Sequence, residues 1–170
     1  NFVHRVMTLA HRLSSEGGNP LTQYDSPRDH AVTINRVNEL ISSAIDSMEK
    51  QRFKEALRSI MGIAQIGNSL LQDAAPWKYL NDDESDERSA SLSSLALSWR
   101  ICGCLAVCMR PFIPFSSDRL WGMMGIESDI DLVLWDHSMD TESDLSWNPD
   151  KPEPLFSRLD LDEILARESS

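Results

Sequence analysis

Two polar side chains at the start of the chain have the types and the spacing to recognise a nucleobase. Asn1 and Arg5 are four residues apart, which places them on one face of a helix. An amide offers both a donor and an acceptor, and a guanidinium offers a fork of donors, so together they can bind the hydrogen-bonding edge of an unstacked base. The alternative is an ordinary surface pair at a helix start, because this spacing is common.

A Pro-Trp pair offers a flat surface for stacking. An apolar helical run that contains Asn68 ends at Pro76, which has no amide hydrogen to donate and disfavours helical backbone in Ala75. Trp77 follows directly, and its ring could stack on a base, an interaction worth about 1–3 kcal/mol. The alternative is a tryptophan buried between helices.

The four other tryptophans compete with Trp77 for the stacking role. Trp99 and Trp121 lie on apolar helix faces, so we expect both in the core. The sequence leaves the surroundings of Trp135 and Trp147 open.

Three cysteines lie within one apolar stretch, as Cys102, Cys104 and Cys108. Their spacing lacks the paired C-x2-C pattern of zinc sites, so we expect small buried core residues and no metal site. Their odd number argues against a disulfide framework and suits a reducing compartment, and we expect a cytoplasmic protein.

Histidines and known catalytic motifs give little support for a reaction site. His4 and His11 are too far apart for the i, i+4 spacing of a helical metal pair. We interpret them as surface or half-buried side chains, with an approach to phosphate or ribose beside Arg12 as the alternative. No nucleophile elbow, phosphate-binding glycine loop or metalloprotease motif occurs, so we predict no catalytic residue and no cofactor site in this chain.

The net charge counts against a simple nucleic-acid binder. The 170 residues carry a formal net charge of −11, whereas nucleic-acid-binding domains are usually basic. Residues 81–170 hold 19 acidic and 7 basic side chains, but residues 1–80 hold 8 acidic and 9 basic ones. The first half therefore offers a nearly neutral face, on which local charge acts within a Debye length of about 8–10 Å.

Other partner classes and the start of the chain are also constrained. No run of about 18 apolar residues predicts a membrane span, and we expect neither a membrane nor a DNA partner. Residues 1–5 show no initiator methionine and no signal-peptide pattern, and they enter a helix without a preceding cap. We therefore expect this chain to be part of a longer polypeptide.

Apolar residues recur at helical spacing in five segments, which predicts an all-α bundle of about five helices over residues 1–126. The fourth segment is apolar on most sides and should be central. The expected helices span residues 1–14, 26–48 (begun by the Ser-Pro-Arg-Asp cap at 26–29), 52–74, 91–109 and 118–124 (capped by Ser116 or Ser117 and closed by Gly125), with a solvated acidic loop at 82–87.

Residues 127–170 are expected to form an irregular C-terminal segment that packs back on the bundle. Residues 132–135 predict a short extended run, and residues 159–166 predict a last helical turn or two. The proline-rich residues 151–156 should dock on the bundle through Leu155 and Phe156.

Four stretches, in order, resemble the C-terminal anticodon-binding domain of methionyl-tRNA synthetase, a class I aminoacyl-tRNA synthetase. The third stretch is shared with other class I synthetases for apolar amino acids, whereas the Asn-Arg pair together with Pro-Trp selects the methionine enzyme. The stretches are Asn1-Phe-Val-His-Arg5, Asn68-Ser-Leu-Leu-Gln-Asp-Ala-Ala-Pro76-Trp77-Lys78, Arg110-Pro-Phe-Ile-Pro-Phe-Ser-Ser-Asp-Arg-Leu120-Trp121-Gly-Met-Met-Gly125-Ile126 and Pro152-Glu-Pro154-Leu155-Phe156-Ser-Arg158.

The resemblance implies an RNA-binding role for the matching positions. Asn1 and Arg5 would hydrogen-bond the cytosine of a CAU anticodon, and Trp77 would stack on it, with Asn68 and Pro76 belonging to the same site. The family often has an arginine directly after this Asn and an acidic residue four positions after it. Ser69 and Gln72 stand there in this chain, so the resemblance says less about the other anticodon bases.

The resemblance also implies that the chain is a fragment of a methionine–tRNA ligase, with no activity of its own. Its partners would be the anticodon loop of methionine tRNA and the catalytic domain of the same polypeptide, which would lie upstream of Asn1. That domain would bind ATP with Mg and carry the zinc-bearing insertion. Two alternatives stay open: the anticodon-binding domain of an isoleucyl, valyl or leucyl enzyme, and a helical protein-interaction domain of this fold, which the acidic charge favours.

Overall fold

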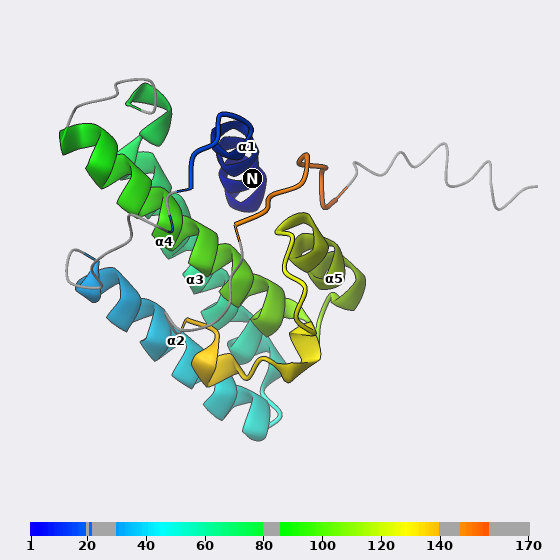
Figure 1. Ribbon diagram of the computed structural model, residues 1–170. Helices are drawn as coiled ribbons and strands as arrows, with labels where there is room; N and C mark the ends of the chain where they lie inside the picture. Colours follow the sequence, from blue (N-terminus) through cyan, green and yellow to red (C-terminus); the bar gives the residue numbers. More distant parts are fainter. Residues whose placement is uncertain (20, 22–29, 80–85, 140–146, 157–170) are drawn as a thin grey trace, which may run out of the picture.

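Helices and single turns of 3-10 helix are the regular elements of the described part of the chain. The computed structural model describes residues 1–19, 21, 30–79, 86–139 and 147–156. No strand occurs among these residues, and five α-helices confirm the predicted all-α class (Figure 1). The elements are α1 (Phe2–Ser15), α2 (Ala31–Glu49), α3 (Phe53–Ala74), η2 (Pro76–Lys78), α4 (Asp86–Met109), α5 (Pro114–Met123), η3 (Ile130–Leu132) and η4 (Trp135–His137).

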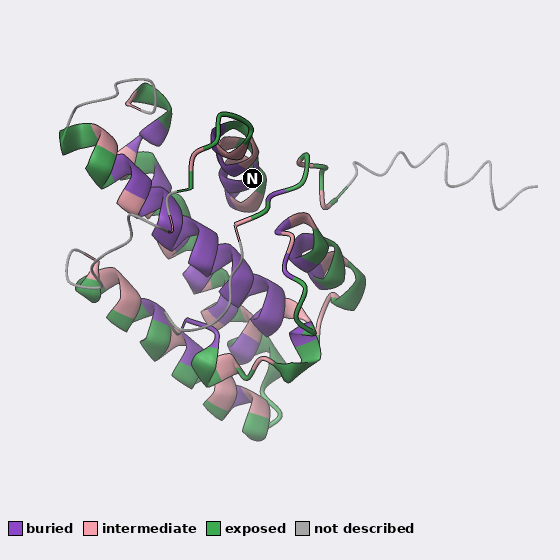
Figure 2. Cartoon of the chain, in the orientation of Figure 1, coloured by how far each residue is buried: buried purple, intermediate pink, exposed green. Residues whose placement is uncertain are grey.

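Helix α4 is the central helix of the bundle, as its composition predicts. Every residue from Ser94 to Cys108 is buried, and Figure 2 shows this as an unbroken buried stretch along the helix. Helices α1, α3 and α5 all pack against α4, and α2 packs against α3. The core helix therefore holds α1 and α3, which carry the candidate site, in a fixed relation to each other.

The apolar character of α4 also meets the length and composition of a membrane span. It is the one helix of that kind in the described part of the chain. However, 89% of its most apolar 18-residue window is buried inside the bundle. A core helix covered by neighbours on all sides produces the same hydropathy signal, and the bundle accounts for it here.

The start of α4 differs from the expected one. The helix is described from Asp86, five residues before the predicted start at Ser91, so the predicted acidic loop at 82–87 is wrong for its last two residues. Asp86 and Glu87 occupy the first turn, where carboxylates interact favourably with the unpaired amides of the helix N-terminus. His30 is the N-cap of α2, so the predicted helix start before residue 30 is wrong at that residue. The rest of the acidic run, the predicted cap residues 26–29 and the predicted last turn at 159–166 lie outside the described residues.

The start of α5 is also corrected by the structure. Pro114 is the first helical residue and Ile113 is the N-cap, so the predicted cap at Ser116 or Ser117 is wrong. A proline is favoured at this position because its missing N–H would be unpaired there in any case. The predicted end is confirmed: α5 closes through Gly125, which has a φ of +66° and sits so close to Asn148 that a Cβ would collide with its backbone.

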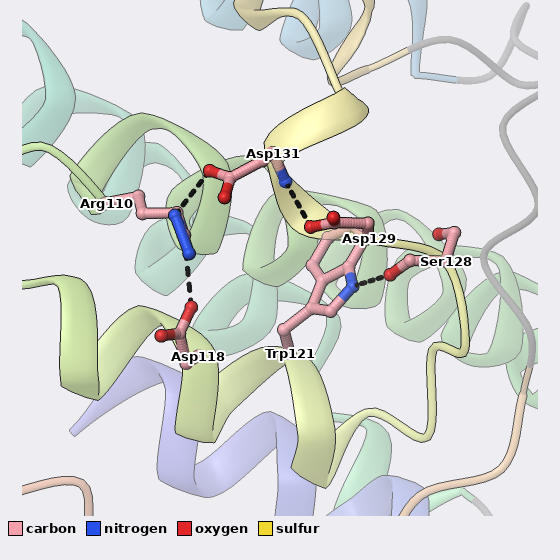
Figure 3. A network of polar contacts seen from close by, with 6 residues as sticks. All are labelled: Arg110, Asp118, Trp121, Ser128, Asp129 and Asp131. Carbon is pink, nitrogen blue, oxygen red and sulfur yellow. Dashed lines mark hydrogen bonds and ion pairs between the residues drawn. The ribbon is translucent and has the colours of Figure 1, made fainter.

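Arg110, directly after α4, ties α5 and the next segment to the bundle (Figure 3). Its Nε donates to Asp118 Oδ1 at 3.0 Å, and its Nη1 forms an ion pair with Asp131. Trp121 Nε1 donates to the carbonyl of Ser128 at 2.7 Å. The ion pair from Arg110 to Asp131 and the hydrogen bond from Trp121 to Ser128 thus fix the start of the C-terminal segment.

The extended run predicted for residues 132–135 is present only in its centre. Val133 and Leu134 have extended backbone, but they separate the two 3-10 turns η3 and η4. The Asp131 amide donates to Asp129 Oδ1 at 2.9 Å, which stabilises the first turn. A local side-chain acceptor therefore favours a turn where the apolar residues alone suggested a strand.

Residues 147–150 run between α1 and α5 (Figure 1). Trp147 Nε1 donates to the carbonyl of Gly18, after α1, at 3.0 Å. The Asp150 amide donates to the carbonyl of Met123 in α5 at 2.9 Å. These contacts connect the two helices through the later part of the chain.

The proline-rich residues 151–156 contact α5, but one of the two side chains predicted to anchor them is exposed. Arg119 of α5 donates to the carbonyls of Pro154 and Leu155 at 3.1 and 3.3 Å, and Leu155 packs half-buried against the core. Phe156 is 65% exposed, so the predicted burial of its ring is wrong. The backbone contacts to Arg119 hold this segment without a second apolar anchor.

Candidate functional site

The first helix presents the two side chains that its sequence singles out. Asn1 is the N-cap residue of α1, and its side chain is exposed and makes no capping hydrogen bond. Its carbonyl accepts the Arg5 amide at 3.1 Å. The two side chains therefore project from consecutive turns, as the i, i+4 spacing predicts.

The guanidinium of Arg5 joins three segments that are far apart in the sequence. Its Nη1 donates to Asn68 Oδ1 at 3.5 Å and its Nη2 to Gln72 Oε1 at 3.2 Å. The same guanidinium lies 4.9 Å from the centre of the Trp77 ring, which is the geometry of a cation–π contact. Arg5, Asn68 and Trp77 are thus brought together, and Gln72 joins them.

Gln72 is the residue that the sequence analysis missed as a member of the site. The resemblance marks Gln72 only as a departure from the family pattern, and its contact with Arg5 was not predicted. The available signal is its spacing from Asn68, because residues four apart on α3 share a helix face. That face meets α1, so both amide oxygens reach the same guanidinium.

Trp77 is exposed, which contradicts the alternative of a tryptophan buried between helices. Helix α3 ends at Ala75, which has a left-handed backbone with a φ of +43°. Pro76 then begins η2 and is buried. This sharp change of direction turns the next side chain outward, so that 37% of Trp77 is accessible to solvent. Pro76 itself has no amide hydrogen to donate.

The other four tryptophans are buried or half-buried within the bundle. Trp99 and Trp121 are buried, as predicted. Trp147 packs on Trp99 with a distance of 4.7 Å between ring centres, and Trp135 is half-buried at the start of η4. Trp77 is therefore the most exposed tryptophan, and the one whose ring is available to a ligand.

The local charge around Arg5 differs from the acidic average of the chain. No carboxylate forms an ion pair with Arg5 within the described residues, because both of its hydrogen-bond acceptors are neutral amides. Arg12, by contrast, pairs with Glu16 at 3.3 Å. His11 donates to the carbonyl of Pro149 at 3.3 Å, so it takes part in the packing of the C-terminal segment, whereas His4 is exposed.

The cysteines belong to the core, as predicted. All three are buried and free of disulfides, and Cys104 and Cys108 lie 4.0 Å apart between their Sγ atoms. Burial raises the pKa of the Cys102 thiol above its ordinary value. In the described part of the chain, no group of three or more His, Cys, Asp and Glu side chains is placed to hold a metal.

Comparison with known proteins identifies the family of the chain. Residues 20–163 match the family model described as the anticodon binding domain of methionyl tRNA ligase. Asn68, Gln72 and Trp77 lie within this match, whereas Asn1 and Arg5 precede it.

Similar proteins include three methionine–tRNA ligases. Those of Methanopyrus kandleri and Aeropyrum pernix are both 30% identical, over 94% and 98% of this chain. That of Porphyromonas gingivalis is 32% identical over 94% of the chain. The alignments cover 22%, 28% and 22% of these ligases, so the chain spans about a quarter of their length. The chain belongs to the family of anticodon-binding domains of methionyl tRNA ligase.

Proposed function

We propose that this domain recognises the CAU anticodon of methionine tRNA through the surface formed by Asn1, Arg5, Asn68, Gln72 and Trp77, named here the Arg5–Trp77 surface. The observation that carries the proposal is the Arg5 guanidinium, which lies over the exposed Trp77 ring and is held by two neutral amides. Anticodon bases leave the stack of their loop, so stacking and edge contacts can recognise them.

The parts of this surface support different kinds of contact. The exposed Trp77 ring supplies the stacking platform, and the Arg5 guanidinium supplies donors to a base acceptor such as O2 or N3 of cytosine. The Asn1 and Asn68 amides add both donors and acceptors. Arg5 covers one face of the Trp77 ring. A base would therefore stack on the accessible part of the ring, or it would displace the guanidinium, which would then bind the hydrogen-bonding edge of the base.

The activity of the whole enzyme belongs to the same proposal. A parent protein of this family would attach methionine to tRNA in the cytoplasm, with this domain joined to a catalytic domain. As the family resemblance implies, we assign the ATP, Mg and zinc chemistry to the catalytic domain of the parent enzyme.

The two alternatives make different predictions for RNA binding. An isoleucyl, valyl or leucyl domain would prefer a different anticodon, and the match to the methionyl family speaks against it. A protein-interaction domain would bind no anticodon, and the net charge of −11 is the observation that favours it.

Binding of CAU and GAU anticodon stem-loops at low salt tests the proposal, with tryptophan fluorescence as the readout. We expect a preference for CAU that is lost in Trp77→Ala, because base stacking is worth about 1–3 kcal/mol. Phe53→Ala is the matched control, since Phe53 is a 56% exposed aromatic at the far end of α3. Equal affinity for both stem-loops, or full affinity in Trp77→Ala, would refute the proposed recognition.

A further inference from the structure

A groove lies on the side of α3 that faces α2, away from Arg5. It has a volume of about 660 Å³ and runs between the first half of α2 and the later half of α3, two helices that pack against each other. Ser69 lines this groove and also the apolar groove that Asn1 and Asn68 border on the α1 side. One exposed ridge of α3 therefore separates the groove beside α2 from the Arg5–Trp77 surface.

Two side chains of opposite charge line the groove beside α2, named here the Arg36–Asp73 groove. Arg36 comes from α2 and Asp73 from α3, and both are exposed. Neither forms an ion pair or a hydrogen bond with another described residue, and they do not pair with each other. A guanidinium offers only donors and a carboxylate offers only acceptors. An occupant with an acceptor and a donor on one edge can therefore bind both side chains.

Three aliphatic side chains form an apolar part of the Arg36–Asp73 groove. Leu40, Ile66 and Leu70 line it, and each packs half-buried against the core. Nucleobases combine a flat apolar face with an edge of donors and acceptors, and proteins bind unstacked bases through both. The groove therefore has the chemistry to bind one nucleobase beside the surface that would bind another.

We propose that the Arg36–Asp73 groove binds the adenine of the CAU anticodon, with Asp73 accepting a hydrogen bond from the N6 amino group and Arg36 donating to a ring nitrogen. This inference rests on the proposed function, in which the Arg5–Trp77 surface holds the cytosine. Adenine directly follows that cytosine in the RNA, and Ser69, which lines the groove, directly follows Asn68 in α3. Adjacent bases would thus lie on adjacent sides of one helix.

The charges of the Arg36–Asp73 groove also determine which base it rejects. Guanine carries the acceptor O6 where adenine carries its amino group, so O6 would face the Asp73 carboxylate, which has no hydrogen to donate. We therefore expect this groove to distinguish adenine from guanine. Arg36 offsets the negative charge of Asp73, so the phosphates that flank the base meet no net charge from this pair.

Titration of CAU, CGU and GAU anticodon stem-loops at low salt tests the inference. The parent chain should bind CAU about tenfold more tightly than CGU. Asp73→Asn should reduce this preference to about twofold or less, because the new amide can rotate to donate to O6 of guanine or to accept from N6 of adenine. The preference for CAU over GAU should stay as in the parent chain. Glu55→Gln, in the first turn of α3 and outside the groove, is the matched control and should keep both preferences.

Arg36→Ala provides a second measurement, because it removes the donor from the opposite wall. We expect about a fivefold weaker affinity for the CAU stem-loop. Arg58→Ala, an exposed arginine of α3 outside the groove, should have a smaller effect. Equal losses in both arginine variants would overturn the role of Arg36.

The stem-loops distinguish a failure of this inference from a failure of the proposed function. Equal affinity of the parent chain for CAU and CGU, or an unchanged preference in Asp73→Asn, would overturn adenine binding in the Arg36–Asp73 groove. A preference for CAU over GAU in the same titrations would then leave the proposed function intact. Failure of every stem-loop to bind would overturn both.

Discussion

Two arginines, Arg5 and Arg110, each connect elements that are far apart in the sequence, but their partners differ. Arg110 bonds the carboxylates of Asp118 and Asp131, so its charge is neutralised within the bundle. Arg5 bonds the neutral amides of Asn68 and Gln72. The side chain of Arg110 is 27% exposed, and both its Nε and its Nη1 donate to carboxylates.

The difference separates a structural arginine from one available to a ligand. Two carboxylates already satisfy the Arg110 guanidinium, so an added anion or base would have to compete with them. Around Arg5 the amides fix the position of the guanidinium without cancelling its charge. A fixed but uncompensated cation beside an exposed aromatic ring suits recognition of an unstacked base in a nucleic acid.

Arg5→Ala should produce the largest effect on RNA binding. Loss of a charged hydrogen-bond donor should cost about 1.5–3 kcal/mol, which is roughly a tenfold to hundredfold increase in Kd for a CAU stem-loop. Titration of the stem-loop at fixed salt measures this change. Arg12→Ala is the matched control on the same helix, since Arg12 pairs with Glu16, and an equal loss in both variants would point to bulk charge instead.

Arg110→Ala should show the opposite pattern. Removal of the guanidinium breaks two ion pairs to different elements (Figure 3), and we expect a loss of about 1–2 kcal/mol in the free energy of unfolding. For a domain of this size, that lowers Tm by roughly 2–4 °C per kcal/mol. Thermal and urea unfolding measure stability, and the same stem-loop titration should show unchanged affinity. A weaker affinity for the stem-loop without a loss of stability would contradict the purely structural role assigned to Arg110.

Local patterns in the sequence predicted the helices, the core and the residue types of the site. Trp99 and the three cysteines lie on a helix that is apolar all round, and the stop at Pro76 follows from one residue. The contact between Gln72 and Arg5 was not predicted, because it spans 67 residues and depends on how α1 packs against α3. The burial of Phe156 was wrongly predicted for a similar reason. The segment is held by hydrogen bonds from Arg119 to its backbone, which the sequence pattern does not indicate.

Gln72→Glu should make the surroundings of Arg5 resemble those of Arg110. The new carboxylate would neutralise the guanidinium and repel phosphates, so we expect about a twofold to fivefold weaker affinity and a less steep salt dependence. Stability should stay the same or rise slightly. Binding curves at several salt concentrations measure both quantities. Gln65→Glu, on the same helix but without a contact to Arg5, is the control, and an equal change there would show that only overall charge matters.

The exposed pair of Lys50 and Asp46 should have the smallest effect, and it tests why Arg110 matters. The hydrogen bond from Lys50 lowers the pKa of Asp46 below its ordinary value of 3.8. A lowered pKa in the folded state adds stability that is present above about pH 4 and is lost as pH falls through the folded-state pKa. The pair is local, within one helix and its end, and both side chains are at least half exposed. Asp46→Asn should therefore barely change urea unfolding at pH 7, and any difference from the parent chain should shrink as the pH falls through the lowered folded-state pKa of Asp46. A loss at pH 7 as large as that of Arg110→Ala would mean that linking distant elements is not what makes an ion pair stabilise this bundle.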